Sequence, residues 1–211
     1  MGTSDLAVDA VVFDLGNVLI RWDPHPAIAA GVGQEEATRF LEAEDFDFGA
    51  WNYRQDEGRS WEEAEAAAVR RHPHWREHIL AYRTHFAHSL LGHIEDTVAV
   101  LADLHEAGVR TFALTNWSAE LFPHARERFA FLTQFDDIVV SGAEGVAKPA
   151  PEIFEVLRRR TGVPLDRCVF VDDKAENVEA AARAGMHPIL FTDTGHLRAD
   201  LRARGLPLPA R

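Results

Sequence analysis

Cysteine is nearly absent from this sequence, which has only Cys168 among its 211 residues. A lone cysteine cannot form an intramolecular disulfide, so the fold has to be stabilised by its hydrophobic core. No apolar run approaches the roughly 20 residues that cross a bilayer, and the N-terminus lacks a basic segment followed by an apolar one. These absences predict a cytoplasmic protein with no membrane partner.

Basic residues are also scarce. The chain has 22 Lys and Arg against 34 Asp and Glu, which gives a formal net charge of −12. Because the basic residues form no long run, we expect no nucleic-acid partner. Hydrophobic residues make up 46% of the sequence, which is enough for one substantial core or for a core with a small inserted unit.

Short β-type runs alternate with helical patterns over much of the chain. The apolar runs cover residues 10–13, 109–114, 137–140, 168–171 and 188–191. Helical periodicity is present over residues 94–107, 152–161 and 176–184. This alternation predicts an α/β protein, with a parallel sheet that is covered by helices on both faces.

Residues 24–93 break the alternation, because this stretch has amphipathic helical patterns and no convincing strand. We expect helices over residues 34–44, 61–71 and 75–89. Since the insertion follows the first strand directly, it should lie above the tips of the strands as a lid.

Polar residues end three of the predicted strands. Asp14 ends the first apolar run and is followed at once by a glycine-containing turn, so its carboxylate should stand at the tip of a buried strand. Thr115 and Asn116 end the second strand, and Asp172 and Asp173 follow the fourth. Any one of these residues could simply cap a helix or a turn. A cap needs only one carboxylate, however, and Asp172 and Asp173 supply two. Because ligands bind at the carboxyl ends of the strands in open α/β sheets, these residues predict an active site.

Two further residues are expected near the same edge of the sheet. Lys148 lies in a turn just before a predicted helix, where its charge could offset that of a phosphate or a carboxylate. Taken singly, a lysine in a loop is usually solvated. Trp117 directly follows the second strand and should pack against a substrate at the rim of the pocket.

In their order and spacing, four segments resemble the haloacid dehalogenase-like hydrolase superfamily, and the resemblance covers nearly the whole chain. The segments are Phe13-Asp14-Leu15-Gly16-Asn17-Val18, Leu114-Thr115-Asn116, Lys148-Pro149 with Pro151-Glu152-Ile153-Phe154, and Val171-Asp172-Asp173 with Asn177. The helical insertion resembles that of the subclass whose small cap lies between the first and second motifs. The resemblance implies a Rossmann-like core of residues 1–22 plus 94–211 and an inserted all-α cap of residues 23–93.

The resemblance also implies roles for individual residues. Asp14 would be the nucleophile that forms a covalent intermediate, Thr115 would bind the transferring group, and Lys148 would stabilise the charged nucleophile. From their positions at the end of the second strand, and not from the resemblance, Asn116 and Trp117 are expected to contact a small, anionic substrate.

In the magnesium-dependent phosphatases of this family, the metal is held by the nucleophile, by a backbone carbonyl two residues later and by an acidic residue of the fourth motif. In this chain those groups are Asp14, the carbonyl of Gly16, and Asp172 or Asp173. Electrostatics favour a metal independently, because like charges ~4 Å apart repel by roughly 4 kcal/mol at an effective dielectric of about 20. Lys148 alone cannot balance three carboxylates and an anionic substrate, and Mg²⁺ with oxygen ligands would.

The chain departs from the family pattern at Gly16. Family members usually carry an aspartate there, which protonates the leaving alcohol and later activates water. General acid or base assistance typically contributes ~10²- to 10⁴-fold, so another group would have to take this role. The candidates are Asp23, His25, Asp45, Asp47 and Asp56.

Three functions remain open at this point. A 2-haloacid dehalogenase uses no metal and also lacks the second aspartate, but it usually has an aromatic residue at the position of Gly16 and lacks much of the acidic pair. The glycine and the pair Asp172 and Asp173 favour a magnesium-dependent phosphatase, whereas Asn116 fits either enzyme. Some bacterial sugar-phosphate phosphatases share the Asp-Leu-Gly-Asn-Val run, so a sugar phosphate is a candidate substrate. A non-catalytic binding protein on the same fold is the third possibility.

Overall fold

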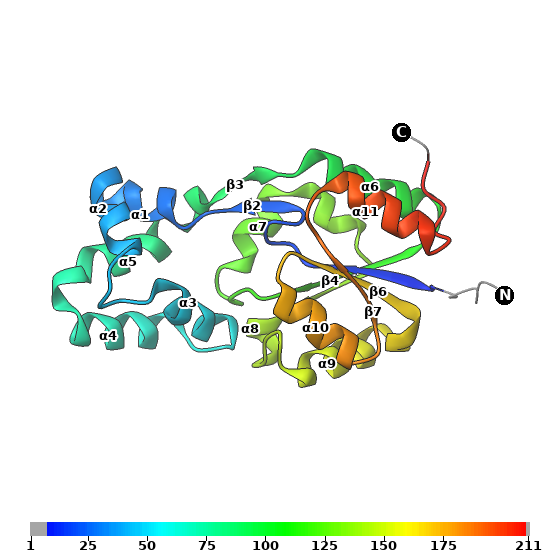
Figure 1. The fold of residues 1–211 in the computed structure, drawn as a ribbon. Coiled ribbons are helices and arrows are strands. Elements are labelled where there is room, and N and C mark those ends of the chain that lie inside the picture. The colour runs from blue at the N-terminus through cyan, green and yellow to red at the C-terminus, as the bar shows by residue number, and fades with distance from the viewer. Residues whose placement is uncertain (1–7, 210–211) are drawn as a thin grey trace.

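Five parallel strands form the centre of the larger of two lobes (Figure 1). The computed structural model describes residues 8–209. The strands lie in the order β5-β4-β1-β6-β7. They are β1 (Ala10–Phe13), β4 (Arg110–Thr115), β5 (Asp137–Val140), β6 (Cys168–Asp172) and β7 (His187–Leu190). All five predicted strands are confirmed to within one residue at each end.

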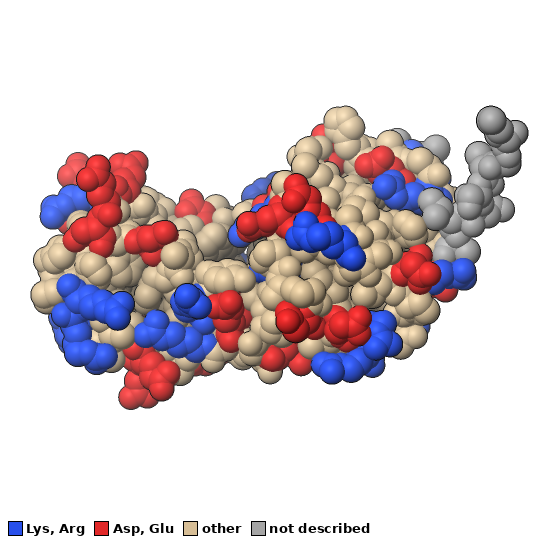
Figure 2. Space-filling model, turned by 60° about the horizontal axis from the view of Figure 1, so that its bottom comes forward, with Lys and Arg blue, Asp and Glu red and all other residues tan. Residues whose placement is uncertain are grey.

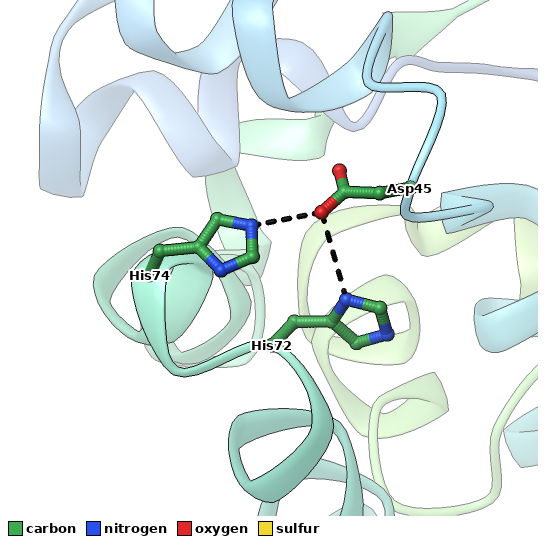
Figure 3. Close-up of side chains that lie close together, drawn as sticks. All are labelled: Asp45, His72 and His74. Carbon is green, nitrogen blue, oxygen red and sulfur yellow. Dashed lines mark hydrogen bonds and ion pairs between the residues drawn. The ribbon is translucent and has the colours of Figure 1, made fainter.

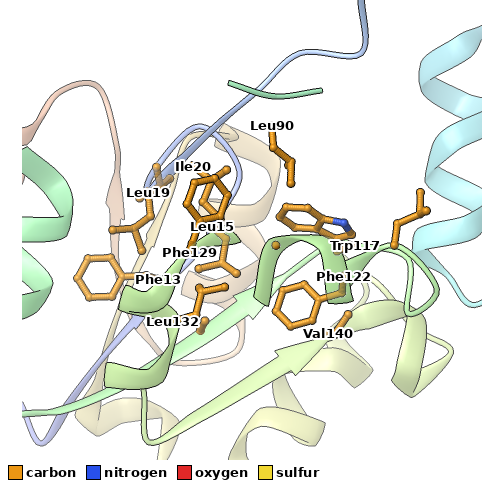
Figure 4. Packing of buried hydrophobic residues seen from close by; sticks show 14 of the residues in the cluster. Phe13, Leu15, Leu19, Ile20, Leu90, Trp117, Phe122, Phe129, Leu132 and Val140 are labelled. Carbon is orange, nitrogen blue, oxygen red and sulfur yellow. The ribbon is translucent and has the colours of Figure 1, made fainter. Parts of the chain in front are cut away.

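Helices cover both faces of this sheet, as predicted. Val11 and Phe13 of β1 pack on the face covered by α6 (Glu95–Glu106) and α11 (Thr194–Ala203). Ala10 and Val12 pack on the other face, under α9 (Pro151–Thr161) and α10 (Ala175–Arg183). All four β1 residues are fully buried, which explains why the strand is a continuous apolar run and not an alternating one. Figure 4 shows Phe13 in the first of these layers, together with Phe129 and Leu132.

A second sheet of two antiparallel strands leads to the smaller lobe. It pairs β2 (Ile20–Trp22) with β3 (Leu90–His93), so the chain leaves the larger lobe along one strand and returns along the other (Figure 1). The prediction that residues 24–93 contain no strand is therefore wrong at β3. Both strands are too short to show an alternating pattern, and each is a strand only because the other pairs with it.

The smaller lobe consists of helices around an aromatic centre. The helices are α1 (His25–Val32), α2 (Gln34–Leu41), α3 (Phe48–Asp56), α4 (Trp61–Arg71) and α5 (Arg76–Thr84), with 3₁₀ turns η1 (Pro73–Trp75) and η2 (Phe86–Ser89). Phe40 contacts Phe46, Phe48 and Trp75 with ring centroids 4.8, 6.3 and 5.3 Å away. The predicted helix over 61–71 is confirmed, the one over 34–44 ends early at Leu41, and the one over 75–89 is broken between α5 and η2.

Helices α1 and α3 are absent from the predictions for physical reasons. Helix α1 has prolines at its start and Gly31 inside it, which lowers its intrinsic helix propensity. Helix α3 has no regular apolar periodicity. It begins because the Asp47 side chain accepts a hydrogen bond of 2.9 Å from the backbone N–H of Ala50.

The other elements of the larger lobe are short. They are α7 (Phe122–Arg128), η3 (Ala130–Gln134), α8 (Ser141–Glu144) and η4 (Leu165–Arg167). Within residues 8–209, no helix combines the length and the apolar character needed to cross a membrane. Acidic and basic side chains both occur on each lobe on the face shown in Figure 2.

Candidate active site

Three neighbouring strands bring the predicted nucleophile and its partners to one edge of the sheet. Asp14 directly follows β1, Thr115 is the last residue of β4, and Asp172 is the last residue of β6. The backbone N–H of Asp14 donates to the carbonyl of Val171 at 2.8 Å, which extends the pairing of β1 with β6 by one residue. Because the strands are parallel and adjacent, their carboxyl ends meet on the side that faces the smaller lobe (Figure 1).

Lys148 lies buried between two carboxylates. Its side chain is 1% exposed, and its Nζ lies 2.9 Å from Asp14 Oδ1 and 2.6 Å from Asp172 Oδ2. Burial lowers the pKa of Lys148, but attraction by the two carboxylates outweighs it and leaves the pKa above its ordinary value. Lys148 is therefore a charged lysine and not a solvated loop residue.

The loop that carries Lys148 is held by hydrogen bonds from both lobes. Asn116 donates from Nδ2 to the carbonyl of Lys148 and accepts at Oδ1 from its backbone N–H, both at 2.8 Å. The hydroxyl of Tyr53, in α3, donates to the same carbonyl at 3.0 Å. Both amide atoms of Asn116 are thus engaged in positioning Lys148, and its predicted contact with a substrate stays a prediction. The sequence did not predict that Tyr53 would hold this loop.

The two adjacent carboxylates of the fourth motif differ in their surroundings. Asp172 is fully buried and accepts hydrogen bonds from Lys148, from the backbone N–H of Lys174 at 2.8 Å and from Asn177 Nδ2 at 3.0 and 3.1 Å. Asp173 is half-buried and lines a cavity. The carboxylate oxygens of Asp172 are therefore already hydrogen-bonded to protein donors, whereas Asp173 faces the space in which a ligand would bind. The sequence placed Asn177 in the fourth motif without a role, and the structure shows that it holds the carboxylate of Asp172.

The site carries more negative than positive charge. Oxygens of Asp14, Asp172 and Asp173 all lie within 4.8 Å of one another. Burial raises the pKa of Asp14 to about 7, with repulsion from the other two carboxylates adding to the effect and Lys148 opposing it. Burial and the charge of Asp172 likewise raise the pKa of Asp173. This crowding of hard oxygen ligands fits a divalent cation such as Mg²⁺.

A cavity of about 220 Å³ lies between the two lobes. The larger lobe contributes Asp14, Thr115, Lys148 and Asp173, and also Gly16, to its lining. The smaller lobe contributes Asn52, Tyr53 and Asp56 from α3, Trp61 from α4 and Tyr82 from α5. The volume is below the ~300–1,000 Å³ of sites for drug-sized molecules, which indicates a small ligand.

Trp117 lies at this cavity, as its position after β4 predicted. It is 7% exposed and packs edge-on against Phe86, with ring centroids 6.1 Å apart. It also packs edge-on against Phe122, with ring centroids 5.6 Å apart (Figure 4). Its backbone N–H donates to Ser141 Oγ at 3.0 Å. The indole is therefore a fixed part of the wall, and its packing against a substrate stays a prediction.

The smaller lobe is docked on the larger one next to the cavity. Trp61 Nε1 donates to Ser118 Oγ at 2.8 Å, and its backbone N–H donates to Glu120 at 2.9 Å. At Gly58, whose φ is +95°, a Cβ would lie 3.2 Å from the Cα of Gly145, so the two backbones approach closely. The turn between α3 and α4 is thereby held against the larger lobe.

A second group of side chains that could ligate a metal, Asp45, His72 and His74, lies on the smaller lobe outside the lining of the cavity (Figure 3). Asp45 Oδ2 lies 2.8 Å from His74 Nε2 and 3.8 Å from His72 Nδ1, and Asp45 Oδ1 accepts from Trp75 Nε1 at 3.0 Å. The bond from Trp75 and those from His74 hold the pKa of Asp45 below its usual value. Asp45 is thus engaged away from the site.

Comparisons with known proteins agree with this architecture. A family profile described as haloacid dehalogenase-like hydrolase matches residues 8–185. A sesquiterpene phosphatase of Aspergillus oryzae is 35% identical over 104 residues, which are 49% of this chain and 53% of that protein. A glyceraldehyde 3-phosphate phosphatase of Methanopyrus kandleri is 34% identical over 110 residues, covering 51% and 46% of the two chains. This chain therefore spans about half the length of these curated relatives.

A solved structure covers more of the chain. A HAD-family enzyme of Bacteroides thetaiotaomicron, in complex with magnesium and inorganic phosphate, superposes with a TM-score of 0.69 at 19% identity. The superposition covers 90% of this chain and 98% of that enzyme, and at this identity it supports the fold alone. The family match over residues 8–185, which is more than half of the sequence, shows that this chain belongs to the haloacid dehalogenase-like hydrolases.

Proposed function

We propose that this chain is a magnesium-dependent phosphomonoesterase that acts on a small phosphorylated metabolite through an aspartyl-phosphate at Asp14. The observation that carries the proposal is Asp14 itself, which lines the cavity while its Oδ1 lies 2.9 Å from the buried Lys148. The names of the two curated relatives, both phosphatases, support the same reaction class.

In this proposal, a carboxylate oxygen of Asp14 attacks phosphorus and displaces the alcohol, and water then hydrolyses the aspartyl-phosphate. Lys148 favours the ionised form of Asp14, which burial disfavours, and offsets the charge on the phosphoryl oxygens. The hydroxyl of Thr115, at the end of β4, donates to one of those oxygens. Asn116 and Asp172 act through Lys148, whose backbone and ammonium group they hold.

The magnesium ligands in this proposal are Asp14, the backbone carbonyl of Gly16 and Asp173. All three residues line the cavity. Asp172 is the weaker candidate because its carboxylate already accepts from Lys148, Lys174 and Asn177. When bound, Mg²⁺ would offset the excess negative charge and stabilise the charge that develops during phosphoryl transfer.

Residues 23–93 would act as the cap of this enzyme and residues 1–22 plus 94–211 as its catalytic core. The cap residues Tyr53, Asp56 and Trp61 form the cavity wall opposite the strand ends. Aromatic rings from both parts line the space for the leaving group, Tyr82 and Phe86 from the cap and Trp117 from the core. Such a wall suits the carbon skeleton of a small alcohol, including that of a sugar phosphate.

The test is phosphate release from a panel of sugar, alkyl and aryl phosphomonoesters, with Mg²⁺ and with EDTA. We expect Mg²⁺-dependent release that is absent from Asp14→Asn. The absence of release from every ester, together with halide release from 2-chloropropionate, would replace the proposal by a dehalogenase. If the chain releases neither phosphate nor halide, it would be a non-catalytic binding protein.

The two acidic residues of the fourth motif should respond differently to substitution. Asp173→Asn removes a proposed ligand, so we expect the Mg²⁺ concentration for half-maximal rate to rise at least about tenfold. Asp172→Asn removes a partner of Lys148, so we expect a lower Tm and a lower kcat with a nearly unchanged Mg²⁺ requirement. Mg²⁺ titrations of phosphate release and thermal unfolding of both variants check this. Equal shifts in the Mg²⁺ requirement would contradict the assignment of Asp173.

A further inference from the structure

The structure discriminates among the residues that could replace the acid missing at Gly16. Asp23 Oδ1 accepts from the backbone N–H of His25 at 2.8 Å, and Asp47 caps α3 through the backbone N–H of Ala50. Asp45 is engaged with Trp75 and His74. Within the described residues, none of these three nor His25 lines the cavity.

Asp56 is the exception. It is the last residue of α3, and it lines the cavity together with Asp14, Thr115 and Lys148. The end of α3 is held in place by the hydrogen bond from Tyr53 to the carbonyl of Lys148. The close approach of Gly58 to the backbone of the larger lobe fixes the turn that follows.

The surroundings of Asp56 suit proton transfer in both directions. Burial raises the pKa of Asp56 to about 7, and the charge of Asp14 adds to this effect. Lys174, a hydrogen bond from the backbone N–H of Ser118, and Lys148 oppose it. Tyr82, which also lines the cavity, is a buried phenol whose pKa is raised above its ordinary value, chiefly by burial and partly by Asp56. Near neutral pH, Asp56 is thus both a proton donor and a proton acceptor.

We propose that Asp56, supplied by the smaller lobe, is the general acid and base of this site and takes the role of the acid missing at position 16. The inference rests on the proposed phosphatase function. As Asp14 Oδ bonds to phosphorus and the bond from phosphorus to the ester oxygen breaks, Asp56 gives its proton to that oxygen and the alcohol leaves. Asp56 then takes a proton from water as the water oxygen attacks phosphorus. The bond to Asp14 breaks, inorganic phosphate is released and Asp56 is protonated again.

Gly16 provides a direct way to test this assignment. A Cβ built at Gly16 has no neighbouring atom within 4 Å, and its φ lies outside the left-handed region. Position 16 therefore has the space and the backbone conformation that the Cβ of an aspartate requires. An acid introduced there would lie at the same cavity as Asp14 and could replace the acid lost from Asp56.

The experiment compares Asp56→Asn with the wild-type chain on an alkyl phosphate and on p-nitrophenyl phosphate. An alkoxide leaves only with a proton, whereas nitrophenolate leaves as an anion. We expect alkyl phosphate turnover to fall by about 10²-fold or more. We also expect Asp56→Asn to release nitrophenolate in a fast burst of one equivalent, followed by slow hydrolysis of the aspartyl-phosphate.

Glu57→Gln is the matched control. Glu57 follows Asp56 in the chain, pairs with Arg54 at 3.2 Å and is absent from the cavity lining. The double variant Gly16→Asp/Asp56→Asn should recover at least tenfold in alkyl phosphate turnover relative to Asp56→Asn. A loss of packing at Asp56 could not be repaired from position 16.

Equal losses on the two esters with no burst, or unchanged alkyl phosphate turnover in Asp56→Asn, would overturn the role of Asp56. Those results leave the phosphatase activity of the wild-type chain standing, so the two proposals fail separately. A wild-type chain that releases phosphate from neither ester would overturn both.

Discussion

Asp14→Asn is expected to lower phosphate release by at least about 10⁴-fold while the fold stays intact. The amide cannot attack phosphorus to form the covalent intermediate, and no neighbouring carboxylate can substitute. Asp172 is held by Lys148 and Asn177, and Asp173 is a proposed metal ligand. Initial rates of phosphate release with saturating Mg²⁺ would measure the loss.

Stability should not fall in the same variant. Asparagine has nearly the shape of aspartate, and Lys148 keeps its 2.6 Å contact with Asp172. Because the pKa of Asp14 is raised to about 7, its ionised form disfavours the folded state at higher pH, and this cost grows as pH rises from about 4 to 7. We therefore expect the Tm of Asp14→Asn at pH 8 without metal to equal or exceed that of the wild type.

Asp9→Asn is the matched control for Asp14→Asn. Asp9 lies just before β1, at the opposite end from Asp14, and its exposed carboxylate pairs with Arg167 at 3.0 Å. An exposed pair of this kind contributes little to stability, so turnover should be close to that of the wild type. Wild-type-like rates in Asp14→Asn would refute an aspartyl-phosphate mechanism at this residue.

Lys148→Met is expected to remove nearly all activity and to destabilise the fold by about 3–5 kcal/mol. The substitution leaves the buried carboxylates of Asp14 and Asp172 without the cation that lies within 3 Å of both. Their mutual repulsion would then have to be relieved by protonation or by local opening. Denaturant unfolding without metal measures the loss of stability, and Mg²⁺ should restore part of it by supplying positive charge at the same place.

The chain offers a natural control, because it has a single other lysine. Lys174 is exposed and makes its contact with Asp172 through the backbone N–H. Lys174→Met should therefore leave the free energy of unfolding within about 1 kcal/mol of the wild-type value. A similarly small change in Lys148→Met would contradict the buried ion pairs as the source of the effect.

Local sequence was sufficient to predict the strands of the central sheet. Each central strand is a short apolar run bounded by turn residues, and strands buried on both faces need no partner of particular sequence to be recognised. The polar residues directly after these runs could be placed at one edge of the sheet, because parallel strands end on the same side. Asp14 and Thr115 are therefore found where the sequence predicted them.

Elements that depend on a distant partner could not be predicted in this way. Strands β2 and β3 are three and four residues long and form only by pairing with each other. Lys148 has the sequence of an ordinary loop lysine, and its burial follows from carboxylates that two other strands bring to it. Whether a charged side chain is solvated or paired depends on such contacts across the fold and not on its neighbours in the chain.

The same distinction between local patterns and contacts across the fold applies to the residues of the site. The alternation of strands and helices and the polar residues at the strand ends predicted the sheet and an acidic site, because these are repeated or local patterns. The resemblance to the family rested on the four motifs. The choice of Asp173 over Asp172 as proposed metal ligand, and of Asp56 among five candidate acids, required the folded chain. Those choices depend on which carboxylates already have protein donors and which line the cavity between the lobes, and both properties arise from contacts between segments far apart in the sequence.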